Sequence, residues 1–175
     1  MRRVATIFLI VLLVTTVLAC QGGHMNESVE IAHFPLDNTQ DMLMPEAASF
    51  VSADSSDGNG ALLFEAQLPK TVELFELKPE PTVREKTILV YQAKMKSSGL
   101  KGTAYLEMWC DFGSKGEYVA RGQNDVVGGD SDWKTVQTHY TIPQGKVLGR
   151  VKLNLVINGQ GNVWLDDLRL LKSKQ

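Results

Sequence analysis

The segment from Thr103 to Phe112, TAYLEMWCDF, combines side chains that suit sugar recognition. Successive side chains of an extended strand point to opposite faces, which divides the segment into two sets. One set is aromatic and acidic: Tyr105, Glu107, Trp109 and Asp111. The other set is apolar: Ala104, Leu106, Met108 and Cys110. Flat rings pack against sugar C–H faces and carboxylates accept hydrogen bonds from hydroxyl groups, so we predict a ligand-binding face backed by a core face.

A second segment, 150–157, shows the same alternation. Its apolar residues are Val151, Leu153, Leu155 and Ile157, and its outward residues are Arg150, Lys152, Asn154 and Val156. If the two strands are neighbours, their outward side chains line one sheet face. The predicted ligand-binding residues are therefore Tyr105, Glu107, Trp109, Asp111, Lys152 and Asn154, with Arg150 beside them. The alternating strand at 87–96 would add Gln92 and Lys94.

A second interpretation of this face stays open. Antiparallel sheets commonly show one polar face to water, and the charged residues would then form ordinary cross-strand pairs. In that case Arg150 or Lys152 neutralises Glu107. Tyr118 and Arg121 follow the turn GSKG and would lie in a loop at the rim of the face, in a strand too short to assign their side.

The elements that must position these residues are strands. Short runs of Val, Ile, Leu, Thr and aromatic residues alternate with turn-forming stretches such as DSSDGNG, SSGLKG and NGQG. We predict strands at 28–34, 48–52, 61–67, 71–77, 87–96, 103–112, 117–121, 134–142, 150–157 and 162–171. Strands at this spacing are typical of an antiparallel sandwich or barrel. The predicted fold class is therefore all-β, an antiparallel β-sandwich.

The amino terminus, MRRVATIFLIVLLVTTVLAC, has the layout of a secretory signal peptide. Its apolar run is about 15 residues, shorter than the roughly 20 that span a bilayer as a helix. Its last four residues, Val17 to Cys20, resemble the lipobox of bacterial lipoproteins. The resemblance implies cleavage before Cys20, lipid on its thiol and, with Gln21 next, export to the outer membrane. We expect a signal peptide at 1–19, a tether at 20–27 and a β-sandwich at 28–172, anchored by lipid to a cell membrane or outer membrane and facing the periplasm or exterior.

Composition narrows the partners and the chemistry. Removal of 1–19 takes away two arginines and leaves 16 Lys and Arg against 20 Asp and Glu, a formal net charge of −4. No segment concentrates basic residues, which argues against nucleic acid as a partner. The sequence lacks G-x-S-x-G, H-E-x-x-H, P-loop and C-x-x-C motifs, so we expect no enzyme, and we expect a monomer. Cys110 has no partner if Cys20 carries lipid, and we predict it as a buried apolar residue.

Three segments resemble the carbohydrate-binding modules that have the galactose-binding-like jelly-roll fold. GNVWLDDLRLL at 161–171 looks like their closing strand, and SFVSADSSDGNGALLFEA at 49–66 is similar to their second conserved stretch. DSDWKTVQTHYTIP at 130–143 resembles their Trp-containing strand, and AYLEMWCDF also resembles uncharacterised exported bacterial proteins. Together, these segments bracket almost the whole mature chain. The resemblance implies a single jelly-roll domain that binds glycans.

The same resemblance implies a structural calcium ion at one edge of the sandwich. Its ligands would be Asp54, Asp57 and Asn59 of the acidic loop and Asp166 of the last strand, since calcium prefers several oxygen ligands. Alternatively, Asp-Gly and Asn-Gly make a tight turn and the acids are ordinary polar positions. An unbroken alternation places Asp166 on one face with Trp164, Leu168 and Leu170, and Asp167 on the other face with Val163, Leu165, Arg169 and Leu171.

Three function classes remain: two non-catalytic roles, and an envelope hydrolase, which would need a pair of acids from separate strands that the sequence does not reveal. The first is a membrane-anchored, non-catalytic lipoprotein that binds glycans on one sheet face. The second is a structural or protein-interaction lipoprotein of the cell envelope that has no saccharide ligand.

Overall fold

The computed structural model describes residues 28–79 and 86–174. The predicted signal peptide, Cys20 and the tether to residue 27 lie outside the described residues. The described part is antiparallel β-structure with two short 3-10 turns, η1 (Pro45–Ala47) and η2 (Gly113–Lys115). The prediction of an all-β antiparallel sandwich is confirmed. None of the described residues belongs to a helix long and apolar enough to cross a membrane.

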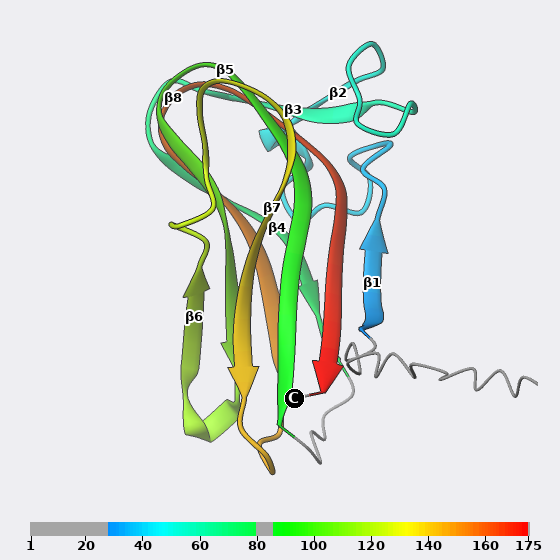
Figure 1. Cartoon of the computed structure of the whole chain (residues 1–175), viewed down its shortest axis with the longest axis vertical. Helices are drawn as coiled ribbons and strands as arrows, with labels where there is room; N and C mark the ends of the chain where they lie inside the picture. The colour runs from blue at the N-terminus through cyan, green and yellow to red at the C-terminus, as the bar shows by residue number, and fades with distance from the viewer. Residues whose placement is uncertain (1–27, 80–85, 175) are drawn as a thin grey trace, which may run out of the picture.

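The strands fall close to the predicted positions, with three exceptions: two expected pairs of strands are each a single strand, and the strand predicted at 134–142 begins at Val127. The strands are β1 (Val29–Phe34), β2 (Ser49–Val51), β3 (Ala61–Ala66), β4 (Lys70–Leu77), β5 (Thr87–Asp111), β6 (Glu117–Arg121), β7 (Val127–Ile142) and β8 (Arg150–Lys174). β5 and β8 are each 25 residues long, and each was expected as two separate strands. Both strands fold back on themselves at one end of the molecule (Figure 1). Each of them therefore contributes one half to each of two layers.

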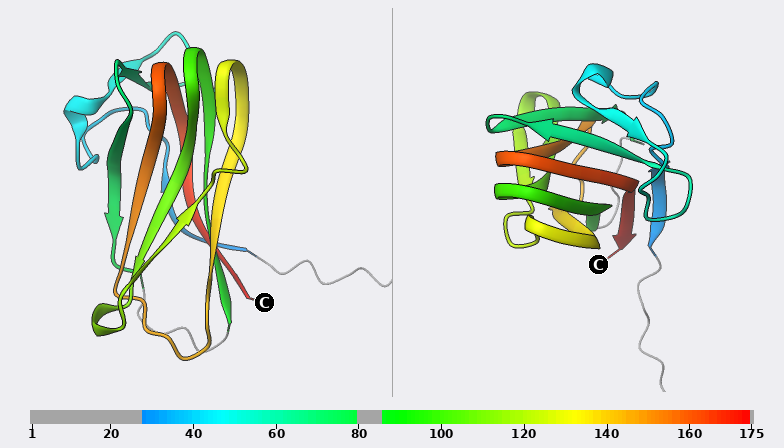
Figure 2. Two further views of the ribbon diagram at one scale, coloured as in Figure 1. Left: turned by 90° about the vertical axis from the view of Figure 1, so that its left-hand side faces the viewer. Right: turned by 90° about the horizontal axis from the view of Figure 1, so that it is seen from above.

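The two layers share β5 and β8. The first layer contains β2, β3, the second half of β8, the first half of β5, and β7. β1 also pairs with the second half of β8, beyond the residues that pair with β3. The second layer contains β4, the first half of β8, the second half of β5, and β6. Seen from above, the bends of β5 and β8 lie side by side, next to the bend of β7 and the β3–β4 turn (Figure 2).

Close backbone approach at the bends requires glycine. A Cβ at Gly102 would lie 2.1 Å from the carbonyl oxygen of Asn158, and one at Gly159 would lie 2.2 Å from that of Lys101. Gly102 also has φ +132°, which L-residues with a side chain rarely adopt. These two positions therefore allow β5 and β8 to bend together while they remain paired.

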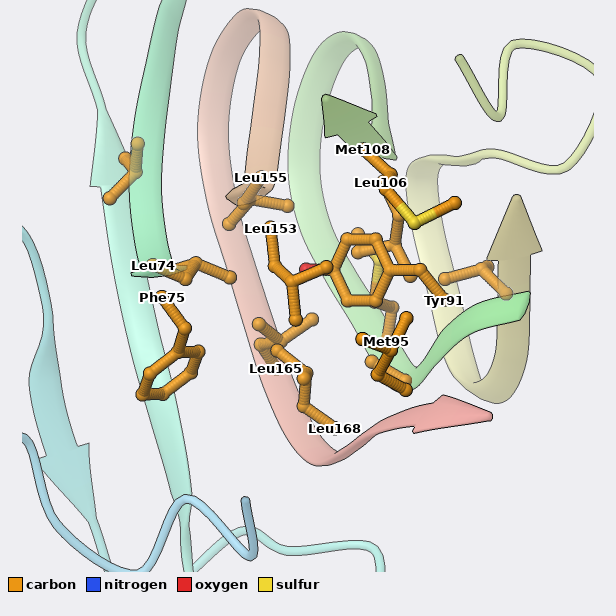
Figure 3. Packing of buried hydrophobic residues seen from close by; sticks show 14 of the residues in the cluster. Leu74, Phe75, Tyr91, Met95, Leu106, Met108, Leu153, Leu155, Leu165 and Leu168 are labelled. Atoms are coloured by element: carbon orange, nitrogen blue, oxygen red, sulfur yellow. The ribbon is translucent and has the colours of Figure 1, made fainter. Parts of the chain in front are cut away.

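The core lies between the two layers (Figure 3). Leu106 and Met108 of the second layer pack in one cluster with Tyr91 and Met95 of the first, and none of the four is exposed. The predicted core faces of 103–112 and 150–157 are confirmed, since their apolar residues are all fully buried. Cys110 is among them, and burial raises its pKa to about 12.

A β-bulge near the end of β8 corrects the predicted alternation. Gln92 of β5 pairs with Arg169 and Lys94 pairs with Asp166, so β8 contains one more residue than β5 across this step. Asp167 takes up the extra residue with φ +46°. An inserted residue shifts the side-chain phase by one position. The predicted grouping of Asp166 and Trp164 with Leu168 and Leu170 is therefore wrong, because the residues that face the core are Val163, Leu165, Leu168 and Leu170.

Candidate functional site

The outward side of the second layer carries a continuous row of polar side chains. Register pairs Glu107 with Asn154, Trp109 with Lys152, and Asp111 with Arg150. β4 adds Glu73 next to Asn154, and β6 adds Arg121 next to Glu107. We call this surface the polar face: Glu73, Tyr105, Glu107, Trp109, Asp111, Arg121, Arg150, Lys152 and Asn154. All six residues predicted as ligand-binding belong to it.

Glu107 lies at the centre of the polar face and is only 6% exposed. Its Oε1 accepts hydrogen bonds from Trp109 Nε1 at 2.7 Å and from Asn154 Nδ2 at 3.3 Å. Its Oε2 accepts from Arg121 Nε at 2.8 Å. The carboxylate therefore receives donors from β5, β6 and β8, which fixes both the indole and the amide. Such a set of hydrogen-bond partners offsets the cost of burying a carboxylate.

A second charged group occupies the end of the polar face near η2. Arg150 lies 3.2 Å from Asp111, 3.5 Å from Glu76 and 3.9 Å from Glu117. Asp111 also accepts a hydrogen bond from the Gly113 amide at 2.7 Å. The ammonium of Lys152 lies 4.0 Å from Glu73. Part of the face thus consists of cross-strand ion pairs, as the second interpretation of the sequence expected, but Arg121 rather than Arg150 or Lys152 pairs with Glu107.

Two buried polar atoms of the polar face have no partner within the described structure. They are the amide oxygen Oδ1 of Asn154 and the guanidinium Nε of Arg150. Asn154 is 4% exposed. An unpaired buried acceptor or donor costs about 1–3 kcal/mol. A ligand that presents hydroxyl groups supplies both kinds of partner, since a hydroxyl donates one hydrogen bond and accepts two.

The aromatic residues of the polar face differ in exposure. Tyr105 is 8% exposed, so it offers little ring surface to a ligand. Trp109 is half-buried, and its indole is held by Glu107 at one edge. Trp109 is therefore the ring of the polar face that is both fixed in orientation and open to solvent.

Arg121 and Glu73 belong to the polar face although neither was predicted as a ligand-binding residue. Arg121 was expected only at the rim. The turn at 113–116 joins β5 directly to β6, and counting outward from it pairs Glu107 with Arg121. That count was available in the sequence. Glu73 has no comparable signal, because β4 pairs with β8 across a long separation in the chain and contains its own bulge.

Three of the four residues predicted to bind calcium, Asp54, Asp57 and Asp166, have partners within the protein. Asp166 is fully buried, and its Oδ2 accepts hydrogen bonds from the Ser56 amide and hydroxyl at 2.8 and 2.7 Å. Asp54 binds the Lys96 ammonium at 2.7 Å, and Asp57 accepts from the Asn59 amide. Among the described residues, no three His, Cys, Asp or Glu side chains are placed to hold a metal ion. Asp54, Asp57, Asn59 and Asp166 in this arrangement do not fit calcium, and calcium binding stays a prediction for experiment.

Comparison with known proteins bears on the fold. No protein-family model matches the chain, and no curated protein matches its sequence. The CBM22-1 xylan-binding domain of Paenibacillus barcinonensis Xyn10C is similar in structure, with a TM-score of 0.59 and 13% identity over 86% of this chain and 98% of that one. The CBM22-1 and GH10 modules of Clostridium thermocellum xylanase 10B, complexed with xylohexaose, give 0.59 and 12% over 83% of this chain. This chain has the jelly-roll fold of carbohydrate-binding modules.

The limits of these similarities are also informative. The match covers only 28% of the Clostridium thermocellum chain, so it concerns one domain of a larger protein. A cyclase from Fischerella sp. TAU matches with a TM-score of 0.53 and 13% identity over 85% of this chain. Folds host unrelated functions, and function must therefore be argued from the residues of the site.

Proposed function

We propose that this protein is a membrane-anchored, non-catalytic lipoprotein whose polar face binds a glycan. The observation that carries the proposal is the unpartnered, buried Oδ1 of Asn154 beside the fixed indole of Trp109. A sugar ring stacked on Trp109 brings hydroxyl groups within reach of the neighbouring strand, where Asn154 lacks a donor. The fold shared with a xylan-binding domain supports the ligand class.

The hydrogen bonds of the acids support a binding role rather than catalysis. Glu107 accepts three hydrogen bonds and Asp111 accepts two. A general acid or base must exchange a proton with the substrate, and carboxylates saturated by donors are poorly suited to this. They are suited to holding a tryptophan and an arginine in place.

The anchoring part of the proposal depends on Cys20 and is supported by the signal peptide that precedes it. Metabolic labelling with a fatty-acid probe should mark the wild-type protein and leave Cys20→Ala unmarked. Equal labelling of both forms would remove the lipid anchor from the proposal and leave glycan binding untouched.

Affinity electrophoresis of the full-length chain, in detergent, tests glycan binding. The protein is run in separate gels that contain xylan, galactan or mixed-linkage glucan. At least one of these polysaccharides should retard its migration. Asn154→Leu, which removes the unpaired acceptor, should migrate faster than wild type in that gel and equally in a gel without polysaccharide. If no polysaccharide retards the wild type and one envelope protein reproducibly co-purifies with it, the alternative of a protein-interaction lipoprotein is supported instead.

A further inference from the structure

The end of the sandwich opposite the bends of β5 and β8 collects lysines that are far apart in the sequence. β4 ends and β5 begins at this end, and two turns, 113–116 and 143–149, connect β5 to β6 and β7 to β8 there (Figure 1). β8 also returns to this end, where it pairs with β1. Each of these five segments brings one lysine. We call this surface the basic end: Lys78, Lys86, Lys115, Lys146 and Lys172.

The lysines of the basic end are free of ion pairs with the described residues, whereas the acids close to them are bound by arginines. Arg169 lies 3.0 Å from Glu30, and Arg150 lies near the three acids described above. With the two arginines, seven basic residues stand against four acids, a formal net charge of +3. The chain after residue 19 has a formal net charge of −4. The fold thus produces a positive surface that no single segment of the sequence contains.

The other end of the molecule, around the bends, has the opposite sign. Five acids stand there against three lysines, a formal net charge of −2. They are Asp54, Asp57, Glu65, Asp130 and Asp132, with Lys70, Lys96 and Lys101. A molecule with charge separated in this way is oriented by a charged surface. An anionic surface attracts the basic end and repels the bends.

The position of β1 connects the basic end with the amino-terminal segment. β1 begins at Val29, which pairs with Lys172 of the basic end. Nine residue steps separate Val29 from Cys20, and a chain of that length reaches at most about 32 Å when fully extended. If Cys20 carries lipid, the basic end is therefore the end that the anchor holds toward the bilayer. The attraction of lysines to anionic lipids is strong only within a Debye length, about 8 Å at physiological salt.

We propose that the basic end docks on the surface of a membrane that contains anionic phospholipids. Its lysine ammonium groups contact the lipid phosphates as mobile point charges. Val147, which is 50% exposed and follows Lys146, enters the headgroup region. The long axis of the sandwich then stands on the membrane, and the polar face on its side stays open to a glycan. This inference rests on the lipid anchor of the proposed function and adds a partner surface and an orientation.

Fluorescence quenching with the full-length chain, held in vesicles by its anchor, tests the docking. Val147→Cys places a thiol for a bimane dye at the basic end, and Leu68→Cys, at a position that is 75% exposed, places one in the β3–β4 turn near the bends. The vesicles contain a lipid with a spin-labelled headgroup, which quenches dyes at the bilayer surface. They consist of phosphatidylcholine alone or of an equal mixture with phosphatidylglycerol.

The two dye positions should respond differently to phosphatidylglycerol. Quenching at Val147→Cys should be about twofold stronger or more in the mixed vesicles, while quenching at Leu68→Cys should not rise. Salt at 1 M, where the Debye length is about 3 Å, should remove the difference. Equal quenching of Val147→Cys in the two kinds of vesicle, or a larger increase at Leu68→Cys, would overturn the docking and leave the anchor in place.

Charge variants of the Val147→Cys protein test the lysines themselves. Lys86→Gln, Lys115→Gln and Lys146→Gln combined should abolish the increase in quenching. Lys70→Gln with Lys101→Gln, at the other end of the molecule, should leave the increase unchanged. The same result for both sets of variants would refute the basic end as the docking surface.

The wild-type protein separates a failure of docking from a failure of the anchor. It should float with both kinds of vesicle and take up no dye, because Cys110 is buried and Cys20 is acylated in the proposed function. A wild type that reacts with the dye and does not float has a free Cys20, which would refute the anchor and the docking together. The electrophoresis of Asn154→Leu tests glycan binding independently of either result.

Discussion

Glu107 and Asp166 are buried carboxylates on the outward sides of opposite layers, and their partners differ in kind. Glu107 is held by three side chains, those of Trp109, Arg121 and Asn154. Asp166 accepts from the amide and hydroxyl of Ser56 and from the amide of Asp167. Side-chain partners can reorient toward a ligand, whereas backbone partners fix a loop. The comparison indicates that Glu107 organises a binding surface and that Asp166 fastens the 52–60 loop to β8.

Each carboxylate also has an unpaired neighbour, and the two neighbours differ. Asn154 Oδ1 near Glu107 is a strong acceptor on a residue that is 4% exposed. Near Asp166, the unpaired atom is the indole Nε1 of Trp164, which has the ammonium of Lys96 5.4 Å from its ring. The Lys96 cation is in turn bound by Asp54. The Asp166 region thus retains an unpaired donor, and the Glu107 region retains an unpaired acceptor.

Asp166→Ala is expected to have the largest effect on stability. It leaves the Ser56 and Asp167 amides without an acceptor, at a cost of about 1–3 kcal/mol for each unsatisfied group. We expect a loss of about 3 kcal/mol in urea unfolding, with Asp166→Asn closer to wild type because one acceptor oxygen remains. If Asp166→Ala lowers the free energy of unfolding by less than about 0.5 kcal/mol, Asp166 does not hold the 52–60 loop against β8.

Glu107→Gln is expected to affect stability less and ligand binding more. The new amide retains one acceptor but turns a donor toward Arg121 or Trp109, which were both bound by the carboxylate. Unfolding should show a loss of about 2 kcal/mol, and retardation by the bound polysaccharide should disappear. Arg121→Lys is the matched variant, since it keeps the positive charge beside Glu107 and should retain most of the retardation. Full retardation of Glu107→Gln would contradict the organising role of Glu107.

Acid pH should destabilise the β1–β8 contact by a smaller amount. Burial raises the pKa of Asp167, but hydrogen bonds from Arg169 and His33 outweigh it and hold this pKa below its ordinary value. A lowered native pKa stabilises the fold above the unfolded pKa of about 3.9, and this stability is lost as pH falls through the native value. Between pH 5 and pH 3 the melting temperature of wild type should fall more steeply than that of Asp167→Asn. An identical slope for the two proteins would refute the contribution of Asp167.

A chelator should have the smallest effect. Since Asp54, Asp57, Asn59 and Asp166 do not fit calcium, the melting temperature should be the same within about 1 °C in EDTA and in millimolar calcium, because a bound ion would raise it by mass action. A clear rise with calcium would support the predicted metal ion. Lys96→Met should be measured in the same way, since it removes the cation that binds Asp54 in the wild type.

Much of the polar face was predictable because period two is unbroken where its strands cross the second layer. Tyr105 to Asp111 and Arg150 to Asn154 alternate without interruption, and sequence alone assigned their sides correctly. The alternation failed at Asp167, because a non-glycine residue with positive φ leaves no signal in the sequence. The partner of Glu107 follows from the β5–β6 register, which a count outward from the turn at 113–116 gives.

Isothermal titration of the full-length chain with xylohexaose, comparing wild type with Trp109→Ala and Trp109→Phe, tests the central claim most directly. If the polar face binds glycans of this class by stacking on Trp109, wild type should bind, Trp109→Ala should lose about tenfold or more in affinity, and Trp109→Phe should fall between them because it keeps a ring without the hydrogen bond to Glu107. Unchanged affinity in Trp109→Ala, with unfolding confirming an intact fold, would contradict glycan binding at the polar face.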